Sequence, residues 1–257
     1  MTIFNKIKNN FSSLVGIAFL LIVWQLLSSL GIVQSFMLPS PIHVCQALIE
    51  DFPLLMSHAG TTLLEAFAGL GIGVSLGFVL ALLMDRFSFL YKSIYPLLII
   101  TQTIPTISIA PLMVLWFGYG MMPKIVLIVI VTFFPVAIGV FDGLKSIDMD
   151  IIKLLKSMGA NPMQILWHAK LPSIRPHFFA ALRISVSYSI VGAVIAEWLG
   201  GMMGLGVYMT RVRKSYALDR MFAVIFVISI TSILLMKLVG LIEKAYMPRL
   251  KRKKENI

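Results

Sequence analysis

Residues 122–140, MPKIVLIVIVTFFPVAIGV, form an apolar run with a single charged side chain, Lys124. A helix needs about 20 apolar residues to cross the hydrocarbon core of a bilayer. Backbone N–H and C=O groups find no water at that depth, so a spanning segment must satisfy them internally. The stretch therefore predicts a transmembrane helix, and with it an all-α membrane protein.

The composition of the whole chain supports this interpretation. Of its 257 residues, 59% are hydrophobic and 13% are charged, whereas a soluble domain has about 45–50% apolar and about 25% charged residues. These values exclude a disordered chain and argue against a soluble enzyme. In a soluble protein the net charge of +11 would suggest nucleic acid. Membrane proteins, however, collect Lys and Arg in short cytoplasmic loops, so we expect no nucleic-acid partner.

Five further apolar runs are long enough to cross a membrane. The six predicted spans are residues 14–33, 61–84, 94–117, 122–140, 178–198 and 221–242. The first follows Lys6 and Lys8, but it is too long for a signal-peptide core and has no clear cleavage site, so we expect an uncleaved anchor. The chain is thus predicted to be polytopic, with about six transmembrane helices.

The third span is interrupted by Pro105 and Pro111, and prolines break the hydrogen-bond ladder of a helix. Irregular backbone at membrane depth is tolerated where protein or a watery cavity surrounds it. The segment therefore either lines a transport pathway or contains a packing kink. The candidate pathway or gate residues are Gln102, Thr103, Pro105, Ser108, Pro111 and, at the end of the fifth span, Glu197.

Carboxyl groups near membrane depth are costly and therefore informative. Glu65 is predicted to lie in the first turns of the second span, where a carboxylate at the interface suits the helix N-terminus. Glu197 ends the fifth span beside Trp198. We interpret it as an interfacial carboxylate, with a gate or solute contact as the alternative.

Lys and Arg residues concentrate at the N-terminus, after the second and fourth spans, and in the C-terminal tail. The positive-inside rule therefore places both termini in the cytoplasm. The loop 199–220 then lies outside although it carries Arg211, Arg213, Lys214 and Arg220. Its charges predict a helix at the lipid headgroups, or contact with an acidic partner or an anionic solute.

Gly69, Gly73 and Gly77 recur every four residues in the second span. Small residues at this spacing share one helix face and allow two backbones to approach closely. We expect this face to pack against another helix, either within the subunit or at a dimer seam.

Motifs for catalysis are absent from the sequence. There is no phosphate-binding loop, the four histidines show no metal-ligand spacing, and no nucleophile–base arrangement can be assembled. A single cysteine, Cys45, cannot make a thiolate metal site alone. We therefore expect no catalytic residue, no metal and no cofactor bound by this chain, which would act as a conduit energised from elsewhere.

The loop between the fourth and fifth spans carries the most specific pattern. Asp148 and Asp150 suit a helix N-terminus. Gly159 suits the position just beyond a helix C-terminus, and Asn161-Pro162 suits the start of a second helix. We expect two short amphipathic helices joined at Gly159 and Ala160, the second ending at Leu171-Pro172. Such a hairpin either lies on the membrane surface or docks a cytoplasmic partner.

This loop resembles the EAA loop of bacterial ABC importer permeases, written E-A-A-x-x-x-G-x9-I-x-L-P. The glycine, leucine and proline match without gaps, whereas the Glu-Ala-Ala triplet and the isoleucine do not. The residues to which the resemblance assigns coupling to an ATPase are Lys153, Leu154, Leu155, Gly159, Ala160, Leu171 and Pro172.

The likeness extends to residues 105–120 and 196–206, which resemble permeases of the nitrate/sulfonate/taurine type. It implies an ABC type I importer permease with a MetI-like helical bundle, in the cytoplasmic membrane of a bacterium. The implied partners are a cytoplasmic ABC ATPase dimer that binds ATP and Mg, a second permease that we expect to be an identical copy, an extracytoplasmic solute-binding protein, and membrane lipid.

The resemblance also implies how the chain is organised. Residues 1–257 would form a single permease domain, with an anchor at about 14–33, a core at about 55–245 and a coupling loop at about 148–173. The solute would be a sulfonate, taurine or nitrate, or a thiamine pyrimidine precursor. The last candidate comes from residues 196–201, which resemble permeases that import such a precursor. The alternative function is a self-sufficient, ion-coupled secondary carrier.

Overall fold

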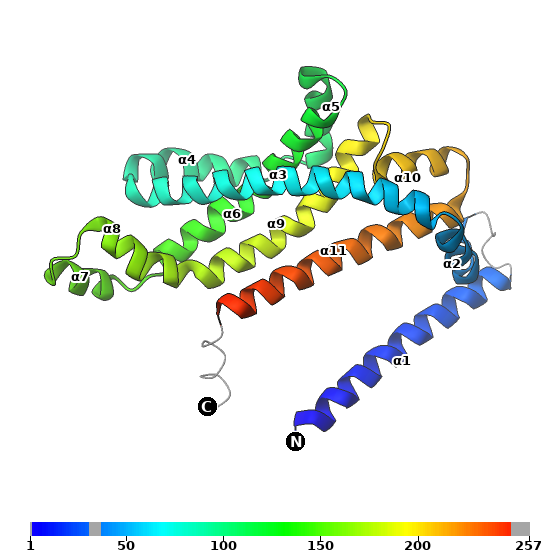
Figure 1. Ribbon diagram of the computed structural model, residues 1–257, viewed down its shortest axis with the longest axis horizontal. Helices are drawn as coiled ribbons and strands as arrows, with labels where there is room; N and C mark the ends of the chain where they lie inside the picture. Colours follow the sequence, from blue (N-terminus) through cyan, green and yellow to red (C-terminus); the bar gives the residue numbers. More distant parts are fainter. Residues whose placement is uncertain (1, 31–36, 248–257) are drawn as a thin grey trace.

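The computed structural model describes residues 2–30 and 37–247, with side chains from residue 15 onward. All regular structure in these ranges is helical (Figure 1), which confirms the all-α prediction. The helices are α1 (Thr2–Ser29), α2 (Pro41–Glu50), α3 (Phe52–Arg86), α4 (Ser88–Thr101), α5 (Thr106–Phe117), α6 (Met121–Lys145), α7 (Met149–Ser157), α8 (Pro162–Ile165), the π-helical turn η1 (Leu166–Lys170), α9 (Leu171–Leu199), α10 (Leu205–Lys214) and α11 (Leu218–Tyr246).

Among the described residues, four helices are long and apolar enough to cross a membrane: α3, α6, the continuous stretch Pro162–Leu199, and α11. A fifth span arises if α4 and α5, which meet at an angle of 102°, count as one broken span. Residues 31–33 of the predicted anchor lie outside the described residues, and the apolar part of α1, Val15–Ser29, is shorter than the four spans. The polytopic character is confirmed, while the number six stays a prediction.

The helix α3 begins at Phe52, well before the predicted start of its span at residue 61. Hydropathy alone marks the lipid-crossing part of a helix, but tertiary contacts extend this one. Leu55 and Ala59 are buried against α10 and α11. Consequently Glu65 lies several turns inside α3, and its predicted place in the first turns was wrong.

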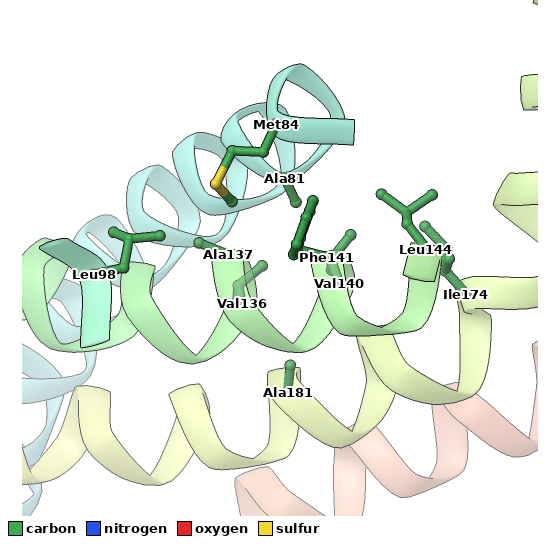
Figure 2. Packing of buried hydrophobic residues seen from close by; sticks show 10 residues of the cluster. All are labelled: Ala81, Met84, Leu98, Val136, Ala137, Val140, Phe141, Leu144, Ile174 and Ala181. Carbon is green, nitrogen blue, oxygen red and sulfur yellow. The ribbon is translucent and has the colours of Figure 1, made fainter. Parts of the chain in front are cut away.

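The helix α6 lies at the centre of the bundle and packs along both α3 and α9. Figure 2 shows the largest buried cluster around it, with Met84 from α3 on one side of Phe141 and Ala181 of α9 pointing toward α6 from the other side. Leu98 of α4 joins the same cluster, so α4, the first half of the broken helix, is anchored to the bundle core.

The glycine face of α3 packs against α6 within the subunit. A Cβ atom on Gly69 would meet Ile128, one on Gly73 would meet Thr132, and one on Gly77 would meet Val136. Each pair is separated by 59 positions in the chain, so the two helices run in parallel with one constant register. The predicted close approach is confirmed, and its partner is α6 of the same chain.

We expect Gly73→Leu to lower the free energy of unfolding by about 1–3 kcal/mol, because a side chain there is forced into α6. The control is Gly71→Leu, two residues away on the same helix, where a Cβ meets nothing within 4 Å. Thermal unfolding of both variants in detergent measures the difference. Equal melting temperatures for the two would contradict the close packing of α3 on α6.

Candidate functional site

The loop between α6 and α9 starts with a capped helix. Asp148 is the N-cap of α7, and its side chain accepts a hydrogen bond from the backbone N–H of Asp150 at 2.8 Å. Lys153 pairs with Asp150 at 2.9 Å on the exposed face. The acidic start of this helix is confirmed. It satisfies an N–H group that would otherwise lack a partner.

Gly159 terminates α7 with a φ of +83°. The N–H of Ala160 donates to the carbonyl of Leu155 at 2.9 Å, and the N–H of Gly159 donates to that of Lys156 at 3.0 Å. A residue with a Cβ is strained in this left-handed conformation, whereas the surrounding space is open. The predicted role of Gly159 beyond the helix C-terminus is confirmed, and backbone conformation is the reason for it.

The second helix begins with a capping box. The Asn161 side chain accepts from the N–H of Gln164, and the Gln164 side chain accepts from the N–H of Asn161, both at 2.8 Å. Pro162 occupies the first turn, where its missing N–H costs nothing. The predicted start of this helix is therefore confirmed.

The predicted end of this helix at Leu171-Pro172 is wrong. The chain continues through the π-helical turn η1 directly into α9, so that Pro162–Leu199 is one long helical stretch. A proline inside an α-helix clashes with the carbonyl four residues earlier. The wider turn just before Pro172 accommodates its ring, as π-bulges do elsewhere. The loop is therefore joined to the bundle by a continuous helical segment.

Apolar side chains of the loop divide into two faces. Ile152, Ile165 and Ala169 are buried between the two short helices. Leu154, Met158, Met163 and Trp167 remain between 61% and 74% exposed. Figure 1 shows that α7 and α8 lie at one end of the long helices, far from α2 and α10. The loop is thus a rigid, two-helix unit with an uncovered apolar surface, which we call the coupling face.

The broken helix borders a cavity. The break between α4 and α5 falls at Gln102–Pro105, with Pro105 as the N-cap of α5. Beside it lies a cavity of about 330 Å³ lined from α6 by Phe134 and from α9 by Tyr188, with Thr101, Gln102 and Thr106 at the break. Pro111 is accommodated inside α5. The break lies at Pro105, and the second proline does not interrupt the helix.

Of the six candidate pathway residues, Gln102 lines this cavity. The cavity lining does not include Thr103, Pro105, Ser108 or Pro111, which are exposed. Glu197 lies elsewhere, buried near the far end of α9. The structure thus brings one of the six to the cavity, and it adds Tyr188 and Phe134, which the sequence patterns did not indicate.

Glu197 organises a buried polar cluster between α3, α9 and the loop that leads to α10. Its Oε1 accepts from the Thr62 hydroxyl at 2.7 Å, and its Oε2 accepts from the Gly206 N–H at 2.6 Å. Thr62 in turn accepts from the Leu205 N–H, and His58 Nδ1 accepts from the Gly204 N–H. These contacts hold the glycine-rich loop, residues 200–206, and with it the start of α10 against the bundle.

Glu65 and Lys124 extend this cluster with an ion pair between α3 and α6. Their charged atoms are 2.7 Å apart, and both side chains are at most 6% exposed. A buried pair of this kind loses its hydration, so its partners must face each other closely. Lys124, the single charged side chain of the predicted span 122–140, is therefore buried within the protein.

The interfacial interpretation of Glu65 and Glu197 was wrong, since both are at most 2% exposed. Their partners come from helices far apart in the sequence, which no local pattern reveals. The glycines that follow Glu197 in the sequence were nonetheless a signal that another group packs closely against this segment. A Cβ atom on Gly204 would overlap the Glu197 carboxylate, and one on Gly206 would lie 3.0 Å from it.

The basic helix α10 rests on the bundle through buried apolar residues, including Leu205 and Val212. Burial and a hydrogen bond donated to Asp51 raise the pKa of the Tyr208 phenol. Arg220, in the first turn of α11, pairs with the same Asp51 at 3.3 Å. Arg213 and Lys214 remain exposed, so these two charges are available to lipid headgroups or to an acidic partner.

Comparison with known proteins identifies the fold and its relatives. Residues 73–252 match the family described as "Binding-protein-dependent transport system inner membrane component". The chain is 36% identical to the formylaminopyrimidine transport permease protein ThiX of Halalkalibacterium halodurans, covering 89% of this chain and 92% of that one. It is 30% identical to the taurine transport system permease protein TauC of Escherichia coli, covering 87% and 84%.

Among solved structures, a chain of the MetNI methionine ABC transporter in an inward-facing conformation has the same fold. The TM-score is 0.67 at 22% sequence identity, over 76% of this chain and 97% of that chain. This similarity confirms the MetI-like helical bundle.

We expect Gly204→Ala to destabilise the protein more than Gly159→Ala. Both glycines have positive φ, so both variants pay about 1–2 kcal/mol of backbone strain. The Gly204 variant adds overpacking of about 1–3 kcal/mol, because its Cβ overlaps the Glu197 carboxylate whereas the Gly159 Cβ meets nothing. Thermal unfolding in detergent gives both values. Equal losses would show that the loop is free to move off Glu197.

Proposed function

Because the chain belongs to the family of binding-protein-dependent transport inner membrane components, we propose that it moves its solute by alternating access, driven through residues 148–173. The chain is the multi-pass permease subunit of an ABC importer, of the nitrate/sulfonate/taurine type. Permeases of this family are non-catalytic, and ATP is hydrolysed by separate subunits.

The coupling face is the observation that supports ATPase docking. An apolar surface of this kind on two short helices suits a groove on a partner, in the helix-in-groove mode. Leu154, Met158 and Trp167 are each more than half exposed, at the end of the bundle where α7 and α8 lie. We propose a cytoplasmic ATPase dimer as the partner that covers them.

Two rigid connections would carry motion from the loop into the bundle. The second loop helix continues without interruption into α9, and Lys170 pairs with Asp85 at the end of α3. Packed helices transmit displacement with little compliance. ATP binding would therefore rock α9 and α3 together, and it must favour the outward-open assembly to shift the population.

The cavity at the broken helix supports an uncharged, planar solute. Its lining offers the Gln102 amide, threonine hydroxyls, and the rings of Phe134 and Tyr188, and the described lining residues include no Asp, Glu, Lys, Arg or His. A sulfonate or nitrate ion would need a cation or a cluster of N–H donors there. We therefore favour a heterocycle over the anionic solutes. An example is formylaminopyrimidine, the solute for which the permease from Halalkalibacterium is named.

The remaining arrangement follows the family and the charge pattern. We propose a single permease domain over residues 1–257, with an anchor at about 14–33, a core at about 55–245, and both termini in the cytoplasm. We further propose a second copy of the chain and membrane lipid against the exposed apolar side chains of the long helices, and an extracytoplasmic binding protein that delivers the solute.

We expect Gly159→Pro to abolish uptake while the protein still inserts into the membrane, because proline cannot adopt the positive φ at this position. The matched control is Gly159→Asn, since asparagine tolerates the left-handed conformation. Purification of each variant from native membranes shows whether a stoichiometric ATPase comes with it. If the unsubstituted chain arrives alone and drives uptake in vesicles from an ion gradient, it is a secondary carrier instead.

We expect Gln102→Ala to lower uptake of formylaminopyrimidine about three- to tenfold, the range that loss of one hydrogen bond corresponds to. Thr103→Ala is the control, because Thr103 is the exposed neighbour that does not line the cavity. Uptake of labelled formylaminopyrimidine and labelled taurine by cells with the complete transporter measures both. If taurine is imported and formylaminopyrimidine is not, the solute class is wrong while the permease function stands.

A further inference from the structure

Three ionisable side chains meet inside the bundle, each from a different helix. Glu65 of α3, Lys124 of α6 and Glu197 of α9 are 2%, 5% and 1% exposed. Two carboxyl groups therefore share the interior with one ammonium group. If both carboxyl groups were ionised, a net negative charge would remain buried without a counter-charge, which a membrane protein avoids.

Within residues 15–30 and 37–247, no other group near the cluster supplies the missing positive charge. His58 of α3 accepts a hydrogen bond from the Gly204 N–H through Nδ1 at 3.0 Å. An imidazolium carries a proton on both nitrogens and cannot accept there, so His58 is neutral. Arg211 of α10 is exposed and donates to the carbonyl of Met202. Among the described groups that face the cluster, Lys124 is left as its cation.

The hydrogen bonds single out one oxygen. Glu65 Oε1 accepts from Lys124, and both oxygens of Glu197 accept, from Thr62 and from the Gly206 N–H. Glu65 Oε2 is buried and has no hydrogen-bond partner in the described part of the chain. This side chain, 3% exposed, lies one helical turn along α3 from Thr62, whose hydroxyl donates to the Glu197 carboxyl group at 2.7 Å.

We propose that Glu65, Lys124 and Glu197 form a binding site for a single proton, which the two carboxyl groups share. With the proton on Glu65 Oε2, the unpartnered oxygen becomes a donor to Glu197, whose oxygens each have room for a second hydrogen bond. The site then holds one carboxylic acid, one carboxylate and one ammonium group, and its net charge is zero.

The proton stabilises the contact of the glycine-rich loop with the bundle. Glu197 holds the loop through the Gly206 N–H and through Thr62, which binds the Leu205 N–H. Release of the proton leaves two carboxylates facing each other, and their repulsion acts on the helices α3 and α9 that carry them. Binding of the proton thus determines how strongly the loop that leads to α10 is held against α3 and α9.

Infrared spectroscopy of the complete protein in lipid vesicles tests the site without any substitution. At neutral pH we expect the carbonyl-stretch band of a protonated carboxylic acid, which shifts when glutamate alone is labelled with carbon-13 and does not shift when aspartate alone is labelled. Absence of a glutamate-sensitive band overturns the proposal. So does a band that appears only after sodium and potassium are removed, since a metal cation would then occupy the site.

Substitutions assign the band to the cluster. We expect Glu65→Gln and Glu197→Gln each to abolish it, because the amide leaves a single carboxylate beside Lys124. The control Glu50→Gln removes an exposed carboxyl group and should leave the band unchanged. A band that persists in both cluster variants belongs to another residue and overturns the assignment. If these variants fail to fold, the isotope measurement on the unsubstituted protein still decides.

Discussion

Two helices immersed in lipid gain little by hiding apolar side chains from their surroundings, because lipid tails are as apolar as leucine. The helices α3 and α6 associate through close backbone approach instead. Along α3, Glu65, Gly69, Gly73 and Gly77 lie on one face, and opposite them on α6 lie Lys124, Ile128, Thr132 and Val136. The glycine contacts bring the helices close enough for the ion pair near the start of α6 to form. The position of α9, and with it the polar cluster, depends on this parallel seam.

Local patterns in the sequence predicted what local physics decides. Apolar runs identified the membrane helices, and the four-residue spacing of glycines identified the close-packed face. Asp148, Gly159 and Asn161 have the predicted cap geometry, because caps depend on residues a few positions apart. These elements needed no knowledge of the rest of the chain.

The errors have two physical causes: contact between distant segments and, at Pro172, a local π-helical turn. Glu65 and Glu197 read as interfacial because nothing near them in sequence reveals Lys124, Thr62 or the Gly206 N–H. Pro172 read as a helix end because a π-helical turn that accommodates its ring has no simple signature. Contact between distant segments also explains why the cavity residues Tyr188 and Phe134 were missed, since they become neighbours through packing of α6 and α9.

The stretch from the second loop helix through α9 joins two regions with different chemistry. At one end is the coupling face, and at the other Glu197 binds the loop before α10. Each residue added to a helix turns everything beyond it by about 100° and advances it by about 1.5 Å. A single insertion between Leu171 and Glu197 would therefore rotate the carboxylate away from Thr62, or rotate the loop away from Asp85. The length of this segment is thus as constrained as the identity of its residues, and chains that share this cluster should differ here by substitution and not by insertion or deletion.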